Sequence, residues 1–167
     1  MKLNLCEIIE VPGASIPFRC ELEKDRFDFT SIKEFKTPIA AQGIVKNSAG
    51  VLYLTGKIQT EMLCVCDRCG REFTREKTID LEVRLTNSPE DEEDLDIFPL
   101  EGDWLDLSQL LESCFILEMD TKFLCKVDCA GLCERCGADL NNGPCGCRAE
   151  IDPRLAVLEQ LLDKNSD

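Results

Sequence analysis

The sequence has no histidine among its 167 residues. This absence excludes every Ser/His/Asp and Cys/His catalytic arrangement, and it excludes zinc sites with an imidazole ligand. The chain also lacks an apolar run close to the ~18 residues of a membrane span, and its N-terminal stretch MKLNLCEIIEVPG does not form a targeting signal. We therefore expect a soluble cytosolic protein that makes no contact with a membrane.

Basic residues are scarce as well. The chain carries 19 Lys and Arg against 33 Asp and Glu, which gives a formal net charge of −14. Such a charge repels nucleic acid phosphates, so the composition predicts no DNA binding and requires a local basic patch for any contact with RNA. Many acidic residues lie between residues 80 and 106, where we expect a solvated loop.

Cysteine, in contrast, is abundant, with 12 residues. In a reducing cytosol, cysteines are more often metal ligands than disulfide partners. Because histidine is absent, a metal site in this chain must be built from thiolates. Four thiolates leave no open coordination position for water or substrate, so the predicted ions are structural, and zinc suits a tetrahedral set of four cysteines.

The spacing of the cysteines predicts two such sites. The stretch LCERCG places two cysteines around a two-residue turn, and the turn-forming residues ADLNNGP bring this pair towards GPCGC. The two cysteines of CKVDC then lack partners nearby, and the predicted hairpin tip CVCDRCG supplies the missing pair. The two predicted zinc sites are the local centre (Cys133, Cys136, Cys145 and Cys147) and the cross-fold centre (Cys66, Cys69, Cys125 and Cys129).

Three alternatives stay open at this point. Cys66 and Cys69 could form the redox pair of a thiol-disulfide oxidoreductase, although no thioredoxin-like β-α-β pattern surrounds them. The Cys-rich module could hold one zinc ion, with Cys125 and Cys129 contributing and another pair left spare. Iron also suits four-thiolate geometry. The remaining cysteines are expected to be small core hydrophobes: Cys6, Cys20, Cys64 and Cys114.

Hydrophobic alternation predicts an antiparallel β-rich core in the first half of the chain. We expect strands in residues 1–11, near residues 16–22, on both sides of the turn NSAG, and in residues 71–86. A helix is expected at DLSQLLESCFIL, where Asp106 is the N-cap, and another at DPRLAVLEQLL. The predicted fold class is α+β, with one helix packed on the core, a small Cys-rich zinc module and a C-terminal helix.

The domain organisation follows from these elements. We expect the following segments: residues 1–86 as the β-rich core with its CxxC hairpin, 87–105 as an acidic loop, 106–120 as the packed helix, 121–148 as the zinc module, and 149–167 as the C-terminal helix and tail.

One basic patch stands out against the acidic background. One face of the strand in residues 71–86 is apolar in its second half. Towards the hairpin tip the same face becomes basic, with Lys77, Arg75 and Arg71. Together with Arg68 in the tip, these residues form the predicted surface for RNA or another partner. The alternative is that these charges lie on a solvated hairpin end without a partner.

The order of these motifs along the chain resembles one known family. The hairpin CDRCGREF, the acidic connection, the helix DLSQLLESCFILEM, the block LCKVDCAGLCERCGADLNNGPCGC and the ending IDPRLAVLEQLL resemble the zinc-type bacterial branch of the YceD family, the large ribosomal RNA subunit accumulation proteins. The resemblance implies a cytosolic bacterial protein that supports the accumulation, processing or stability of 23S ribosomal RNA, with no assigned enzymatic activity. We therefore expect a noncatalytic ribosome-biogenesis factor whose partner is 23S rRNA or a large-subunit ribosomal protein.

Overall fold

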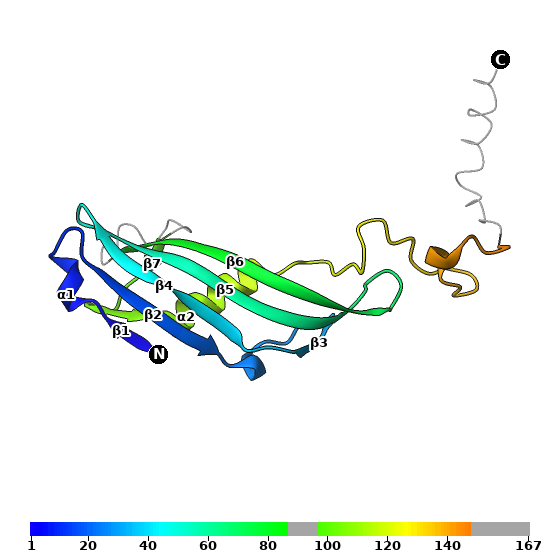
Figure 1. The fold of residues 1–167 in the computed structure, drawn as a ribbon, viewed down its shortest axis with the longest axis horizontal. Coiled ribbons are helices and arrows are strands. Elements are labelled where there is room, and N and C mark those ends of the chain that lie inside the picture. Colours follow the sequence, from blue (N-terminus) through cyan, green and yellow to red (C-terminus); the bar gives the residue numbers. More distant parts are fainter. Residues whose placement is uncertain (87–96, 148–167) are drawn as a thin grey trace, which may run out of the picture.

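A long antiparallel sheet runs through most of the molecule in the computed structural model, which describes residues 1–86 and 97–147 (Figure 1). Its strands lie in the order β2 (Ser15–Leu22), β4 (Ile39–Ser48), β5 (Val51–Val65), β6 (Glu72–Thr86) and β7 (Ile97–Pro99), and β3 (Ile32–Phe35) also pairs with β5. Only β7 runs parallel to its neighbour among these described strands. The predicted α+β class with an antiparallel core is confirmed.

The β5–β6 hairpin is the longest element and carries one of the cysteine pairs at its tip. Its strands pair without a break from Leu52 opposite Leu85 to Val65 opposite Glu72. Apolar residues alternate along both strands, and one face of β5 is fully buried at Leu54, Ile58 and Met62. A one-residue slip would turn this face towards water, so the hydrophobic pattern holds the register that positions the tip.

The tight turn between β4 and β5 is the predicted NSAG turn. Ala49 and Gly50 both have positive φ, at 54° and 89°. Two successive residues with positive φ form the type of turn whose twist matches that of antiparallel strands, and glycine adopts this conformation at little cost.

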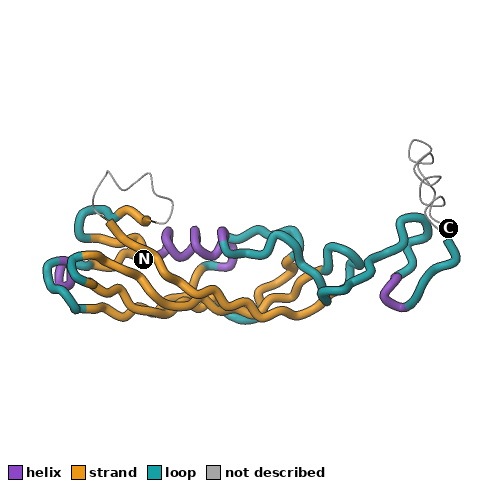
Figure 2. Tube along the Cα trace, turned by 90° about the horizontal axis from the view of Figure 1, so that it is seen from above, coloured by secondary structure: helices purple, strands orange, loops and turns teal. Residues whose placement is uncertain are grey.

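Helix α2 (Leu107–Leu117) lies across one face of the sheet (Figure 2). The predicted cap is confirmed, because the Asp106 carboxylate accepts a hydrogen bond from the backbone N–H of Gln109 at 3.1 Å. The buried side of the helix ends in Phe115, whose ring lies 4.8 Å from that of Phe27 between centroids. The chain after α2 then leads to the Cys-rich segment, described over residues 121–147, which extends beyond the hairpin tip (Figure 1).

The N-terminus differs from the prediction. Instead of one strand in residues 1–11, the chain forms β1 (Lys2–Asn4), paired with β8 (Trp104–Asp106), and then the short helix α1 (Cys6–Ile9). The Asn4 side chain accepts a hydrogen bond from the Cys6 N–H, and the buried Asn47 amide donates to the carbonyls of Ile8 and Ile9. These polar contacts stabilise a helical turn where the alternating pattern favours a strand.

The four cysteines outside the two predicted centres divide between core and surface. Cys64 is fully buried, and Cys20 and Cys114 are half-buried against the core, as expected. Cys6 is exposed, so its interpretation as a core residue is wrong; its Sγ lies 3.0 Å from an Asp103 carboxylate oxygen.

Several expected segments lie partly or wholly outside the described residues. The acidic stretch 87–96 and the predicted C-terminal helix and tail are outside them. Within the described remainder of the expected acidic loop, the chain forms β7 and begins β8. The other short helical turns are η1 (Lys24–Arg26) and η3 (Leu140–Asn142). Over residues 1–86 and 97–147, no helix has both the length and the apolar content to span a bilayer.

Candidate metal centres

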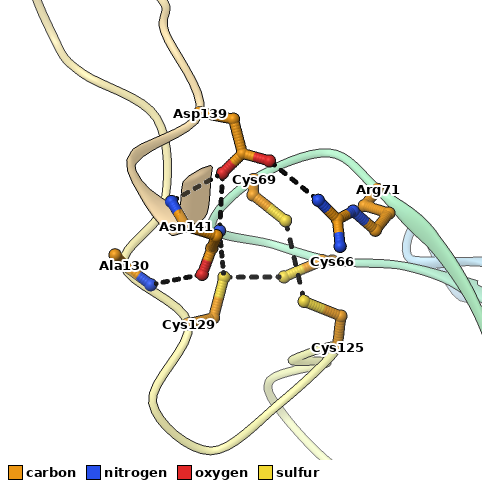
Figure 3. A network of polar contacts seen from close by, with 8 residues as sticks. All are labelled: Cys66, Cys69, Arg71, Cys125, Cys129, Ala130, Asp139 and Asn141. Carbon is orange, nitrogen blue, oxygen red and sulfur yellow. Dashed lines mark hydrogen bonds and ion pairs between the residues drawn. The ribbon is translucent and has the colours of Figure 1, made fainter. Parts of the chain in front are cut away.

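The four cysteines of the cross-fold centre come together from two distant parts of the chain. Cys66 and Cys69 lie in the turn between β5 and β6, and Cys125 and Cys129 follow α2 (Figure 3). All four sulfurs lie within 4.8 Å of one another. The Sγ atoms of Cys66 and Cys129 are 3.7 Å apart, as are those of Cys69 and Cys125. The structure thus groups these cysteines as the partition by spacing predicts.

The sulfur separations fit a metal ion better than disulfides. A tetrahedral zinc ion with Zn–S bonds near 2.3 Å places its sulfurs about 3.8 Å apart. The observed 3.7 Å contacts match that edge, whereas a disulfide joins its sulfurs at about 2.05 Å. Both contacts join the hairpin to the segment after α2, so an ion here would tie these two parts together.

The ionisation of the thiols also fits a cation. Burial alone would raise the pKa of Cys66, but hydrogen bonds from the backbone N–H groups of Cys125, Arg68 and Cys69 bring it down to about 6. Burial, together with the neighbouring thiols, raises the pKa of Cys125 to about 12. The cluster therefore accepts a first negative charge readily and resists the last one, and a divalent cation supplies the compensating charge that four thiolates need.

The local centre repeats this arrangement on the surface. Its four sulfurs also lie within 4.8 Å of one another, although Cys136 and Cys147 are exposed. Backbone N–H groups of Cys136 and Arg135 lower the pKa of Cys133 to about 6. The pKa of Cys147 is raised to about 12, mainly by hydrogen bonding with Cys136 and next by burial. The donor set of this centre fits a divalent metal ion for the same reason as the other.

The two CxxCG turns share one backbone hydrogen-bond pattern. The N–H of Gly70 donates to the carbonyl of Cys66 at 2.9 Å, and that of Gly137 donates to Cys133 at 2.8 Å. Both glycines have positive φ, 69° and 71°, which directs the turn back towards its first cysteine. This common geometry indicates that each turn presents its two sulfurs to one point.

Asp67 fixes the hairpin tip to the segment after α2. Its carboxylate accepts hydrogen bonds from the Ser31 hydroxyl and from the Phe123 N–H, both at 2.5 Å, and these bonds lower its pKa. Its own N–H donates to the Phe123 carbonyl at 2.8 Å. The partners are 36 and 56 residues away along the chain, so the spacing of the cysteines gives no sign of this role.

The four predicted contact residues each bind an acceptor in the segment between residues 120 and 139. Arg68 donates to the Cys129 carbonyl at 2.8 Å, and Arg71 forms an ion pair with Asp139 at 2.9 Å. Arg75 and Lys77 share Asp120, at 3.3 and 3.1 Å. The side chains of Arg71, Arg75 and Lys77 are 54%, 39% and 16% exposed. Arg68 and Arg71 therefore brace the Cys-rich segment against the hairpin, and Arg75 and Lys77 brace the residue just before that segment. The contact of these four cations with a partner stays a prediction.

Comparison with known proteins adds a family and several relatives. A family model described as "Large ribosomal RNA subunit accumulation protein YceD" matches residues 54–162, a range that includes the eight cysteines of both centres. An uncharacterized protein of Mycobacterium tuberculosis is 31% identical over 124 residues, covering 72% of this chain and 59% of that protein. In Arabidopsis thaliana, the protein named "Large ribosomal RNA subunit accumulation protein YCED homolog 1, chloroplastic" is 26% identical over 159 residues, covering 77% of this chain and 50% of that protein. The chain thus spans roughly half to three fifths of these relatives' length, and no solved structure matches it.

Proposed function

Because the chain belongs to the YceD family of large ribosomal RNA subunit accumulation proteins, we propose that it is a noncatalytic ribosome-biogenesis factor that supports the accumulation, processing or stability of 23S rRNA. As a 23S factor of a bacterium, it would act in the cytoplasm. At the level of single residues, the proposal is supported by two sulfur contacts of 3.7 Å across the fold, from Cys66 to Cys129 and from Cys69 to Cys125. In this proposal two zinc ions are structural, and they hold the hairpin and the Cys-rich segment together as one unit that binds the partner.

Burial of the hairpin thiols favours this structural role over thiol-disulfide exchange. Cys66 is 2% exposed and Cys69, the other member of the candidate redox pair, is 9% exposed, so both residues are buried and an incoming disulfide has little access to them. An exchange reaction requires direct attack of a thiolate on the sulfur of its partner. An oxidoreductase would form a reversible disulfide between Cys66 and Cys69, which thiol trapping after mild oxidation detects; we expect no such species in the metal-loaded protein.

We propose that Arg68, Arg71, Arg75 and Lys77 contact rRNA phosphates while they brace the Cys-rich segment. Three of them meet acidic partners, and the ion pairs of the more exposed Arg71 and Arg75 are weak enough for a phosphate to compete for the cation. The rest of the surface is acidic, since the net charge is −14, and outside these four cations it favours a basic ribosomal protein as the partner. Crosslinking in cells distinguishes these partners, because an RNA contact yields 23S fragments and a protein contact yields a ribosomal protein.

A pair of variants separates RNA contact from bracing. Arg75→Glu removes both the cation and its bond to Asp120, whereas Asp120→Asn removes only the acid that holds Arg75 and Lys77. If Arg75 contacts phosphate, Arg75→Glu weakens RNA binding and Asp120→Asn preserves or strengthens it. Equal loss in both variants would mean that Arg75 acts only as a brace. Lys57→Glu is the matched control, since it reverses a cation of the sheet that pairs with the exposed Asp80.

The biological test is the level of 23S rRNA in cells depleted of this protein. We expect the ratio of 23S to 16S rRNA to fall on depletion and to recover with the wild-type chain but not with Cys66→Ser. Normal 23S levels in depleted cells, with growth and ribosome content unchanged, would overturn the proposal. Recovery by the Cys66→Ser chain would instead refute the need for the cross-fold centre.

A further inference from the structure

Asn141 belongs to the loop of the local centre, but its side chain binds a ligand of the cross-fold centre. The residue lies in η3, between the two cysteine pairs of the local centre. Its Nδ2 donates to the Sγ of Cys129 at 3.4 Å, and its Oδ1 accepts from the N–H of Ala130 at 3.0 Å (Figure 3). A residue that lies between the two cysteine pairs of the local centre therefore contacts a buried sulfur of the other centre.

Asp139 determines which way this amide points. One carboxylate oxygen accepts from the backbone N–H of Asn141 at 2.9 Å and from its Nδ2 at 2.7 Å. The other oxygen binds Arg71 at 2.9 Å. Both N–H bonds of the Asn141 amide are thus used, one on Asp139 and one on Cys129. A flipped amide would turn its oxygen towards a carboxylate and a sulfur, so only the observed orientation satisfies the partners.

Backbone contacts place the same loop against the hairpin tip. The N–H of Leu140 donates to the Gly131 carbonyl at 2.9 Å, and the N–H of Leu132 donates to the Arg68 carbonyl at 3.2 Å. Gly131 has a φ of +77°, and a Cβ at this position would lie 3.2 Å from the Arg68 carbonyl oxygen. The loop between Cys136 and Cys145 thus rests on the segment of Cys129, and that segment rests on the tip.

An N–H···S hydrogen bond stabilises the negative charge of a metal-bound thiolate, and loss of such an outer partner typically weakens metal binding by about 10- to 100-fold. Cys136 and Cys145 flank the loop that carries Asn141, so a metal ion bound between them would restrict the motion of that loop. We propose that Asn141, held by Asp139, couples the two metal centres, so that metal binding at the local centre strengthens metal binding at the cross-fold centre. The inference rests on the proposed metal sites, and by linkage the strengthening is mutual.

The test is a zinc titration of the full chain against a chromophoric chelator. Cys136→Ser with Cys145→Ser leaves only the cross-fold centre, and we expect that centre to bind zinc about 10- to 100-fold more weakly than in the wild-type chain. Asn141→Leu is expected to cause a loss of the same size with all eight cysteines present. Combining the two changes should add little, because both remove the same hydrogen bond. Asn142→Leu is the matched control, since the Asn142 side chain makes no hydrogen bond within residues 1–86 and 97–147.

Cadmium-113 NMR adds a second readout, because the chemical shift of each bound ion reports the surroundings of its sulfur ligands separately from the affinity. The wild-type chain should give two cadmium signals, and Asn141→Leu or Asp139→Asn should shift the signal of the cross-fold centre. If the wild-type chain binds two ions, a zinc affinity of the cross-fold centre that stays within twofold in every variant, or losses that simply add, would overturn the coupling and leave the metal sites intact. Fewer than two ions in the wild-type chain would overturn the proposed sites themselves.

Discussion

Replacing Cys66 by serine is expected to lower the free energy of unfolding by about 4 kcal/mol. The Cys66–Cys129 contact joins residues 63 apart in the chain, and Cys69–Cys125 joins residues 56 apart. A link that closes a loop of about 60 residues removes enough conformational freedom from the unfolded chain to stabilise the fold by about 4 kcal/mol. The local centre closes a loop of about a dozen residues, for which the same relation gives about 3 kcal/mol.

Urea denaturation of the metal-loaded chain, followed by far-UV circular dichroism, measures this loss. With a denaturant dependence of about 2 kcal/mol per molar urea, the midpoint should fall by about 2 M. Cys6→Ser is the control, because Cys6 is exposed and belongs to neither centre. The reasoning fails if Cys66→Ser loses less than about 1 kcal/mol and still binds two ions.

Three further predictions concern the parts that support the centres. Gly131→Ala should lose about 1–2 kcal/mol of stability, because its φ is +77°, whereas Gly146→Ala, whose added Cβ meets nothing within 4 Å, should be close to neutral in the same urea experiment. Asp120→Ala should lower the free energy of unfolding by about 1–3 kcal/mol, because it removes the shared partner of two partly buried cations. The control Asp80→Ala should stay within about 0.5 kcal/mol of the wild-type chain. Equal effects in the two variants would show that Asp120 is no brace. Phe115→Ala should lose about 3–5 kcal/mol in thermal or urea denaturation, since its ring is fully buried among aromatic neighbours, and a loss below 1 kcal/mol would contradict that packing.

The strands that carry the hairpin pair were predictable because apolar residues recur at every second position over much of their length. Residues 71–86 were expected as one strand, and the structure has β6 at Glu72–Thr86. The N-terminus was not predictable in this way. Its alternation suits a strand, but Asn47, far along the chain, binds the carbonyls that end a helical turn there. A distant polar partner that overrides a local pattern leaves no local sign in the sequence.

The grouping of the cysteines could be predicted because spacing pairs them locally and elimination then pairs the remainder. The polar residues around them could not. Asp120 meets Lys77 from 43 residues away, and Asp139 meets Arg71 from 68 residues away. These contacts depend on how the segment after α2 returns to the hairpin. That course of the chain is a tertiary feature, and no local pattern in the sequence indicates it. The cations of the predicted basic patch therefore have intramolecular partners that their spacing did not indicate.

The metal content of the full chain tests the central claim most directly. Elemental analysis of the purified protein, set against its concentration from amino-acid analysis, counts the ions bound to each chain. Two four-cysteine centres predict about two zinc ions per chain. About one ion would contradict the cross-fold centre, and none would contradict both centres.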